Sequence, residues 1–214
     1  MCNPRLFDAP KFRLAGVAVE GGRATLKVGL TGYRAYVATH RAANWKAIPA
    51  ASRSRALGVE AALRTADGYY ALARRSSAVA THGGLYNGPS GHPEPGAVKA
   101  DPGADEADAA RRGAAAEILV DGVLDEIVAE LGVPRPSLST PRLIGACADD
   151  RGKPDLLFLV TTTLSSAAVA SARESAAEKW EADDLVFRRD PGDLPLTPVT
   201  RAAFACVARL GRPP

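Results

Sequence analysis

The stretch DEIVAELGV, Asp125–Val133, combines the periodicity of an amphipathic helix with a glycine stop. It predicts a helix from about Ala114 to Leu131. Gly132 follows the last turn, where a left-handed conformation favours glycine, and Pro134 then prevents the helix from continuing. A helical wheel places four apolar residues on one face, the expected core stripe: Leu124, Ile127, Val128 and Leu131.

The same helix has two glutamates, Glu126 and Glu130, one turn apart on the flank of the core stripe. Neighbouring carboxylates repel each other at neutral pH, so a positive charge is expected between them. Oxygen ligands of this kind suit Mg²⁺, which takes one or two protein carboxylates and completes its shell with water and substrate phosphates. The pair by itself also fits an acidic flank that is neutralised by solvent and counter-ions.

Apolar residues alternate on both sides of this helix, which predicts strands. Upstream, a β-hairpin is expected over Phe12 to Leu30, around Gly21-Gly22. Three further strand regions are expected: Leu57–Ser76 around the turn Ala66-Asp67-Gly68, Arg142–Leu164 around Asp150-Arg151-Gly152, and DDLVFRR at 183–189. Short helices are expected in Thr31–Trp45 with aromatic anchors Tyr33, Tyr36 and Trp45, in Ser165–Glu174, and at the end in Thr197–Gly211.

These elements predict an α/β sandwich around a mixed sheet. The chain has 214 residues, enough for one domain with an elaborated end. We expect the hairpin and helix region, residues 1–56, to pack on a core domain of residues 57–214. Residues 78–113 are rich in glycine and proline, which predicts a long loop.

Composition excludes several classes of function. The formal net charge is +3 and the arginines are scattered, which argues against a nucleic-acid-binding surface. No segment has the length and apolarity of a membrane span, and the N-terminus does not resemble a signal peptide. The three cysteines, Cys2, Cys147 and Cys206, lack metal-ligand spacing, which suits a reducing compartment and predicts a cytoplasmic protein. Phosphate-binding patterns of the Rossmann and Walker types are absent from the sequence.

The loop GPSGHPEP and the helix that carries DEIVAELGV together resemble the signature of the Nudix hydrolases, G-x5-E-x7-R-E-U-x-E-E-x-G-U, where U is a bulky aliphatic residue. Gly91 matches the opening glycine and Glu117 has the spacing of the earlier glutamate. Glu126 matches the first glutamate of the R-E pair, and Glu130 the second of the E-E pair. Ile127, Gly132 and Val133 fill the U, G and U places of the pattern.

The chain departs from this pattern at four places. Ser90 stands where the family usually has a first glycine, and Asp125 replaces the arginine that orients a glutamate. Ala129 replaces one acid, which removes a metal ligand. Residues 92–116 form a longer segment than the pattern has between its glycine and its first glutamate.

A wider resemblance extends over nearly the whole chain. The segments LFDAPKFRL, GLTGYRAYVATH, LGVEAAL, GGLYNGPSGHPEP and LDEIVAELGVP are similar to a divergent Nudix branch from animals. Members of that branch hydrolyse UDP-glucose and UDP-galactose to UMP and sugar 1-phosphate with Mg²⁺. The resemblance implies a Nudix-type α/β/α sandwich around a mixed sheet, with an additional N-terminal β-region.

The resemblance also implies metal ligands. It makes Glu126 and Glu130 ligands of a catalytic divalent ion, Mg²⁺ or secondarily Mn²⁺. Glu117 is a further candidate ligand through water, with a capping role at the helix N-terminus as the alternative. Glu181 occupies a region where the family often has a general base or an additional ligand, although a surface position is equally compatible with its acidic neighbours.

Substrate contacts are expected from five residues, each of which also has a structural reading. Arg74 and Arg75 end a strand before the loop, and one of them should point to the cleft because strand residues alternate faces. That arginine could contact a phosphate, or be a strand-end charge in solvent. Tyr86 or Phe7 could stack on the uracil, or lie in the core. His92 could contact substrate or hold the loop.

The sequence therefore predicts a Mg²⁺-dependent enzyme that hydrolyses a UDP-sugar as its small-molecule partner, without nucleic acid or membrane. Two alternatives stay open: a Nudix pyrophosphatase for ADP-ribose, coenzyme A or another dinucleotide, and a weakly catalytic protein that binds nucleotide sugars. An RNA-end-binding role fits poorly with the modest charge. A homodimer is compatible with the sequence, but no stripe identifies an interface.

Overall fold

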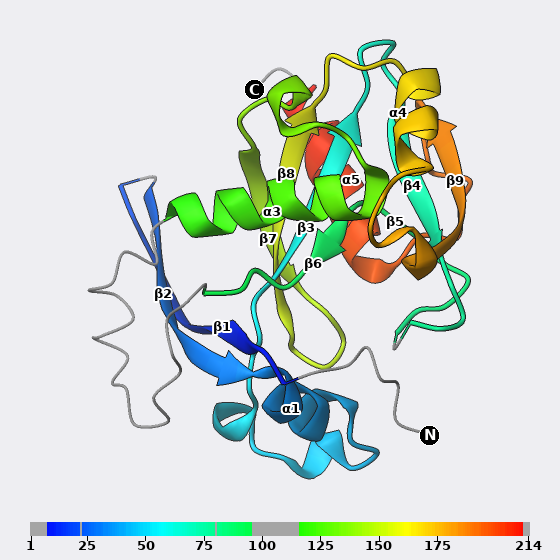
Figure 1. The fold of residues 1–214 in the computed structure, drawn as a ribbon. Helices are drawn as coiled ribbons and strands as arrows, with labels where there is room; N and C mark the ends of the chain where they lie inside the picture. The colour runs from blue at the N-terminus through cyan, green and yellow to red at the C-terminus, as the bar shows by residue number, and fades with distance from the viewer. Residues whose placement is uncertain (1–7, 22, 80, 96–115, 212–214) are drawn as a thin grey trace. The chain divides into compact units, whose positions relative to one another are not determined.

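The structure, a computed structural model, describes residues 8–21, 23–79, 81–95 and 116–211 (Figure 1). The chain divides into two compact units. The first comprises Met1–Gly58, His92–Leu119 and Ala148–Pro154, and the second comprises Val59–Gly91, Val120–Cys147 and Asp155–Pro214. The simpler division into residues 1–56 and 57–214 stays a prediction.

The first unit begins with the predicted hairpin. Strands β1 (Pro10–Glu20) and β2 (Arg23–Gly32) pair antiparallel, with Phe12 opposite Leu30. The register shifts between Leu14 and Gly16, where one strand has an extra residue. Phe12 and Leu14 are buried. The prediction of a hairpin over this stretch is confirmed.

The hairpin leads into a short helical region, as predicted. Helix α1 (Tyr33–Tyr36) continues as a π-helical turn, η1 (Val37–Arg41), and two 3₁₀ turns follow, η2 (Trp45–Ala47) and η3 (Ala50–Ser52). Tyr36 is buried as an anchor. Trp45 is only half-buried, and its ring lies 4.9 Å from the Arg53 guanidinium and 5.7 Å from that of Arg151. Trp45 thus packs through cation–π contacts instead of a core contact.

The second unit is built on a seven-stranded sheet in the order β5-β4-β3-β8-β7, with β6 paired to β3 and β9 paired to β4. Its strands are β3 (Gly58–Arg64), β4 (Tyr70–Arg75), β5 (Tyr86–Asn87), β6 (Ser90–Gly91), β7 (Arg142–Ala148), β8 (Pro154–Thr161) and β9 (Ala182–Arg188). The predicted strand regions are confirmed. The short strands β5 and β6 lie in the expected loop, and β6 brings that loop onto the sheet beside β3.

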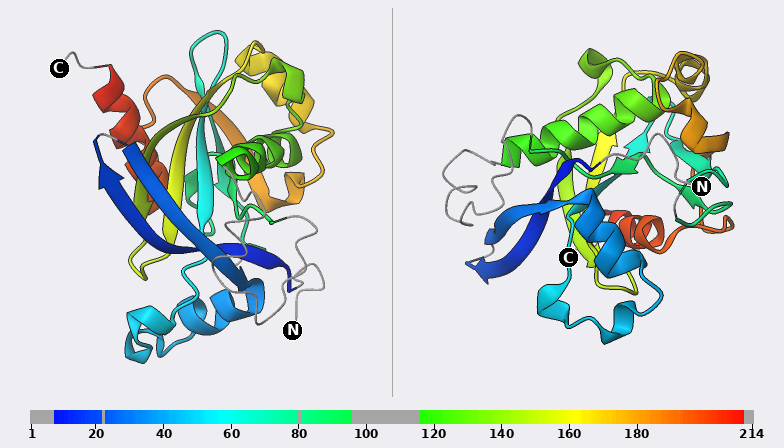
Figure 2. Two further views of the ribbon diagram at one scale, coloured as in Figure 1. Left: turned by 90° about the vertical axis from the view of Figure 1, so that its left-hand side faces the viewer. Right: turned by 60° about the horizontal axis from the view of Figure 1, so that its bottom comes forward.

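Three helices pack on this sheet: α3 (Ala116–Leu131), α4 (Ser166–Arg173) and α5 (Pro198–Leu210). Figure 2 shows α3 and α4 on one face of the sheet and α5 on the other. Two 3₁₀ turns, η4 (Arg135–Ser137) and η5 (Lys179–Glu181), complete the unit. The predicted α/β/α sandwich around a mixed sheet is confirmed. Within the described residues, no helix is long and apolar enough to cross a membrane.

The buried face of α3 differs from the wheel prediction. Its buried apolar residues are spaced four apart: Leu119, Val123, Ile127 and Leu131. Val128 is 37% exposed and Leu124 is half-buried, so the predicted stripe was wrong at both positions. Glu130, expected on the flank, is only 7% exposed. On the wheel, the buried row from Leu119 to Leu131 lies nearer to Glu130 than to Val128, because packing on the sheet determines which face is buried.

Gly132 ends α3 in the conformation that the sequence predicts. Its φ is +65°, and its amide donates to the carbonyl oxygen of Val128 at 2.9 Å. A Cβ on Gly132 would lie 2.3 Å from the carbonyl oxygen of Ala172 at the end of α4. The glycine is therefore required by both its backbone angle and the close approach of the neighbouring chain.

We predict that Gly132→Ala lowers the free energy of unfolding by about 1–3 kcal/mol, because a residue with a Cβ is strained at this φ and meets a backbone oxygen. Urea unfolding measures the change. Gly211→Ala is the matched control, since Gly211 follows α5 with a φ of −82° and no atom within 4 Å of an added Cβ. Equal effects of the two substitutions would contradict the explanation.

Candidate functional site

Helix α3 and strand β6 meet at the two predicted glutamates. The backbone amide of Ser90 donates to Oε1 of Glu130 at 2.8 Å. A Cβ on Gly91 would lie 1.8 Å from Oε1 of Glu126, so this carboxylate occupies the space that a side chain at position 91 would need. Both glutamates thus pack directly against the backbone of Ser90-Gly91, and position 91 must be a glycine for Glu126 to lie where it does.

Ser90 replaces the first glycine of the family pattern without backbone strain. In the described part of the chain, the non-glycine residues with positive φ are Arg55 and His82. Ser90 contributes its amide to Glu130, and its Oγ accepts a hydrogen bond from Nδ2 of the buried Asn87 at 2.9 Å. The substitution therefore preserves the backbone contact that positions Glu130.

The electrostatics of this site are dominated by its carboxylates. Burial raises the pKa of Glu130 well above its usual value, and the charges of Glu126 and then Glu181 raise it further. The Ser90 amide and the charge of Arg75 act in the opposite direction. The pKa of Glu181 is also raised, first by burial and then by the charge of Glu178, while Arg75 lowers it. A divalent cation would relieve this concentration of negative charge.

Glu181 reaches the site from the 3₁₀ turn η5, immediately before β9. The amide of Ser76, after β4, donates to the carbonyl oxygen of Glu181 at 2.8 Å. The amide of Glu178 donates to the carbonyl oxygen of Ala129 at 2.8 Å. The turn is therefore attached both to the end of β4 and to α3, one residue before Glu130.

The structure distinguishes the two predicted arginines. Arg75 is half-buried, its Nε donates to the carbonyl oxygen of Thr81 at 2.9 Å, and its charge acts on Glu130 and Glu181. Arg74 is exposed and follows the alternation of the strand to the opposite face. Only Arg75 is therefore brought together with the carboxylates.

Tyr86 is not brought to the carboxylates. It pairs with Arg74 across β4 and β5, and Arg74 pairs in turn with Asp184 of β9. The hydroxyl of Tyr86 donates to Oδ2 of Asp184 at 3.3 Å. Cross-strand partners share a face, so Tyr86 lies on the face opposite Arg75.

Three further site residues were predicted: Glu117, His92 and Phe7. Glu117 is exposed in the first turn of α3, and the nine residues to Glu126 correspond to two and a half turns, which puts the two side chains on opposite sides of the helix. His92 belongs to the first unit, where it is half-buried with its ring 5.3 Å from that of Tyr36, and desolvation of the imidazole lowers its pKa. Phe7 lies outside the described residues.

Three buried polar residues near the site were missed in the sequence. Glu60 of β3 is 3% exposed and pairs with Ser90 of β6, and a single acid in an apolar strand was an available signal. Asn87 directly precedes the GPSG loop, so its neighbourhood was a weaker signal. Arg173 at the end of α4 is 8% exposed. No pattern in the sequence pointed to Arg173.

The donor set suits a hard divalent cation with few protein ligands. The described residues contain no group of three or more His, Cys, Asp or Glu side chains arranged to hold a metal ion. Glu126 and Glu130 nevertheless supply adjacent carboxylates on one side of α3, with Glu181 within electrostatic reach. Mg²⁺ needs no more protein ligands than two, since water and substrate phosphates complete its shell.

The residue in place of the family's arginine lies away from this cluster. Asp125 is exposed, with its Oδ1 3.6 Å from Nη2 of Arg135, and the same guanidinium nitrogen is 2.7 Å from Oδ1 of Asp121. The three side chains form an exposed ion-pair group on the outer side of α3. Asp125 therefore does not add its charge to the buried carboxylates.

We predict that Gly91→Ala leaves the protein folded but weakens divalent-cation binding by about 10- to 100-fold. The added methyl group must displace the Glu126 carboxylate, which is the end of a flexible side chain and can move at little cost to the fold. Mn²⁺ titration followed by electron paramagnetic resonance measures the affinity, and the melting temperature checks the fold. Gly16→Ala, where the nearest atom is 3.9 Å from the added Cβ, is the control. Unchanged Mn²⁺ affinity in Gly91→Ala would disprove the steric argument.

We also predict that Glu130→Gln stabilises the metal-free protein at neutral pH. The folded-state pKa of Glu130 is raised, so protonation stabilises the fold fully below the ordinary pKa, and this contribution is lost as pH rises through the folded value. Glutamine keeps the neutral state at every pH. Melting temperatures in a chelator should therefore show a gain that is largest at pH 7–8 and disappears below about pH 4.

Glu174→Gln serves as the control for this experiment. Glu174 is exposed and its pKa is lowered, first by the hydrogen bond from Lys179. Its substitution should give no stabilisation at neutral pH. A lower melting temperature of Glu130→Gln at pH 8 would mean that burial of this charge does not destabilise the fold.

No family model matches the chain, but curated proteins resemble it over most of its length. Human (Homo sapiens) uridine diphosphate glucose pyrophosphatase NUDT22 is 36% identical over 185 residues, which covers 77% of this chain and 59% of that protein. The bovine (Bos taurus) protein of the same name is 34% identical over 207 residues, covering 86% of this chain and 70% of that protein. Nudix hydrolase 9 of Arabidopsis thaliana is 29% identical over 209 residues, covering 86% and 66%.

The chain thus spans less than two thirds of the length of the human relative. Among solved structures, the MutT protein from Methanosarcina mazei aligns with 73% of this chain and 95% of its own, at a TM-score of 0.48 and 18% identity. The family assignment rests on the curated relatives and not on this likeness. Because it is 34% identical to a relative of which it spans 70%, the chain belongs to the Nudix hydrolase family.

Proposed function

We propose that the protein hydrolyses the diphosphate bond of UDP-sugars, UDP-glucose or UDP-galactose, to UMP and sugar 1-phosphate. The observation that supports this most directly is that Glu126 and Glu130, the two carboxylates matched to the signature, both pack against Ser90-Gly91. The curated relatives named uridine diphosphate glucose pyrophosphatase support the choice of substrate.

The residues of the site fit a divalent ion, and Nudix hydrolases generally use one. We assign Glu126 and Glu130 as its protein ligands and Mg²⁺ as the ion, with Mn²⁺ as the second choice. When bound, the ion supplies positive charge against the diphosphate and acidifies the attacking water. Glu117 stays a predicted ligand through water only, because α3 places it on the side opposite Glu126.

The chain's own residues supply the remaining steps of the proposed reaction. Glu181 accepts the proton of the attacking water, and its raised pKa makes it a better proton acceptor than an ordinary carboxylate. Arg75, which faces the same carboxylates, binds a phosphate oxygen of the substrate through its guanidinium. Water attacks one phosphorus atom, the P–O–P bond breaks, and the leaving phosphate becomes the second product.

Selectivity is assigned to residues outside the signature, because the metal ligands contact only phosphates. From the sequence alone, residues 1–56 are the predicted source of base and sugar recognition. His92 and Phe7 remain predicted substrate contacts, and so does Tyr86, although Tyr86 and Arg74 lie on the sheet face opposite Arg75. Cysteine usage supports a cytoplasmic location, and a homodimer is compatible with the sequence.

A protein that binds nucleotide sugars with little turnover is the second candidate. The observation that favours it is the loss of two motif residues, since Ala129 supplies no ligand and Asp125 is paired with Arg135 on the exposed side of α3. A Nudix pyrophosphatase for ADP-ribose or coenzyme A is the nearest enzymatic alternative. The three candidate functions predict different outcomes with UDP-glucose: hydrolysis, binding without turnover, or no hydrolysis.

The deciding experiment is product analysis of UDP-glucose incubated with Mg²⁺ and either the wild type or Glu126→Gln. We expect UMP and glucose 1-phosphate from the wild type, and a rate at least about 100-fold lower from the variant, a loss typical of removing one electrostatic group. Asp121→Asn is the matched control, because Asp121 is an exposed acid on the same helix that pairs with Arg135.

Each other outcome selects one reading. Cleavage of ADP-ribose or coenzyme A without cleavage of UDP-glucose would keep the family chemistry and reject the UDP-sugar assignment. Binding of UDP-glucose without turnover of any of these compounds would favour the binding protein. Equal rates for the wild type and Glu126→Gln would reject the metal site.

A further inference from the structure

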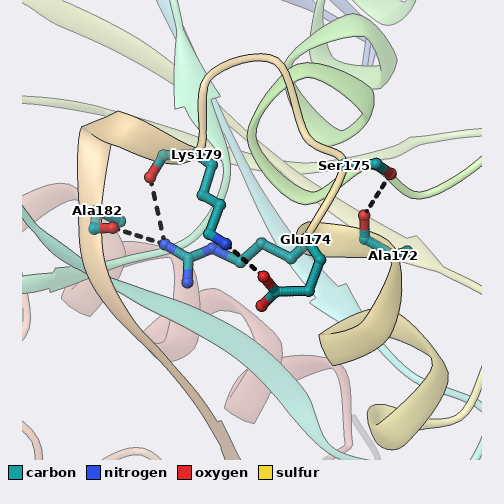
Figure 3. A network of polar contacts seen from close by, with 6 residues as sticks. Ala172, Glu174, Ser175, Lys179 and Ala182 are labelled. Atoms are coloured by element: carbon teal, nitrogen blue, oxygen red, sulfur yellow. Dashed lines mark hydrogen bonds and ion pairs between the residues drawn. The ribbon is translucent and has the colours of Figure 1, made fainter.

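Arg173 is the last residue of α4, and its guanidinium is buried beside the turn η5. Its Nη2 donates to the carbonyl oxygen of Ala182 at 2.7 Å, with a longer contact of 3.5 Å to the carbonyl oxygen of Lys179 (Figure 3). These two carbonyls lie on either side of Glu181 in the chain. One side chain from α4 thus holds both ends of the short segment that carries Glu181.

Burial of this guanidinium calls for a reason other than stability. A buried charge is costly unless it is paired and fully hydrogen-bonded. The hydrogen bonds described for Arg173 go to backbone carbonyls, and its Nε has no hydrogen-bond partner among the described residues. The carboxyl of Glu174, whose pKa is lowered first by the hydrogen bond from Lys179 and also by the charge of Arg173, is exposed to solvent. A neutral or apolar residue at the end of α4 would avoid this cost. The arginine is therefore better explained by its bonds to the turn η5 than by a contribution to the stability of the core.

The remaining contacts of the turn show why its position matters. The carbonyl of Glu181 accepts a hydrogen bond from the amide of Ser76, directly after β4. The amide of Glu178 donates to the carbonyl of Ala129 in α3, next to Glu130. Arg173 supplies the third attachment, from α4. Together these contacts determine where the Glu181 carboxylate lies relative to Glu130 and Arg75, the two groups with which it interacts.

We propose that Arg173 is a positioning residue, which acts on the reaction by holding the Glu181 carboxylate at the site. This proposal rests on the proposed function, in which Glu181 accepts the proton of the attacking water. Arg173 itself contacts neither substrate nor metal. Its loss allows the turn to move, so the carboxylate is less often in place when water attacks.

A second contact on the same turn provides a matched control. The ammonium group of Lys179 pairs with the carboxylate of Glu174, and both side chains are largely exposed (Figure 3). Exposed ion pairs contribute little to stability. Lys179→Gln and Arg173→Gln each remove one positive charge from this region. In Lys179→Gln, however, the backbone carbonyl of residue 179 stays bound to Arg173.

The kinetic test compares Arg173→Lys and Arg173→Gln with the wild type, on UDP-glucose with Mg²⁺. We expect kcat to fall about 10- to 100-fold, the usual range for a residue that orients a reacting group, with KM changed less than about threefold. The larger loss should come from Arg173→Gln, since lysine can still donate to one carbonyl. Lys179→Gln should stay within about twofold of the wild type.

A double variant separates positioning from general destabilisation. If Arg173 acts through Glu181, then Arg173→Lys should cause no further loss of kcat in a Glu181→Gln background. A structural defect would lower the rate by the same factor in both backgrounds. Such an additive loss, or full activity of Glu181→Gln alone, would overturn the proposal.

Hydrogen exchange gives a readout that does not depend on turnover. The amides of Ser76 and Glu178, which donate to Glu181 and Ala129, should exchange faster in Arg173→Lys than in the wild type or Lys179→Gln. Unchanged exchange at these amides would reject the positioning role, whatever the substrate is. A wild type that does not cleave UDP-glucose would instead count against the proposed function, while the exchange data would still decide whether Arg173 holds the turn.

Discussion

The site depends on one close approach, the contact of helix α3 with the backbone of Ser90-Gly91. The Glu126 carboxylate fills the space beside Gly91, and Glu130 accepts the Ser90 amide. Because β6 is paired with β3 in the sheet, this contact places both carboxylates at a defined position over the sheet. Position 91 requires glycine because the Glu126 oxygen would overlap any Cβ there, and not because of a turn in the backbone.

The same contact has an energetic cost. Glu130 is buried beside two other carboxylates, and its pKa rises in consequence. A fold selected only for stability would place an apolar residue there, as the neighbouring positions of α3 do. The site therefore holds a concentration of negative charge that the fold tolerates and that a cation would relieve. Carboxyl groups with such shifted pKa values are common at functional sites.

Glu181 shows how a site is assembled from distant segments. It joins the helix pair only because η5 is attached to β4, α3 and α4 at once. Arg75 belongs to the same group because strand alternation sends it toward the carboxylates and sends Arg74 away. The sequence named all three of these residues, but it could not choose between the arginines, because the register of a strand against its neighbours determines which face each residue takes.

The sequence by itself determined the long strands, the extent of α3, its end at Gly132 and the pair of helix glutamates, since these follow from local periodicity and backbone preference. Only the tertiary structure decided that Val128 is exposed and Glu130 buried, that Tyr86 and Glu117 lie apart from the carboxylates, and that Arg173 holds the Glu181 turn. These outcomes depend on which surfaces meet when helices pack on the sheet. Local patterns do not encode such contacts, because a side chain's surroundings are supplied by segments that are distant in the sequence.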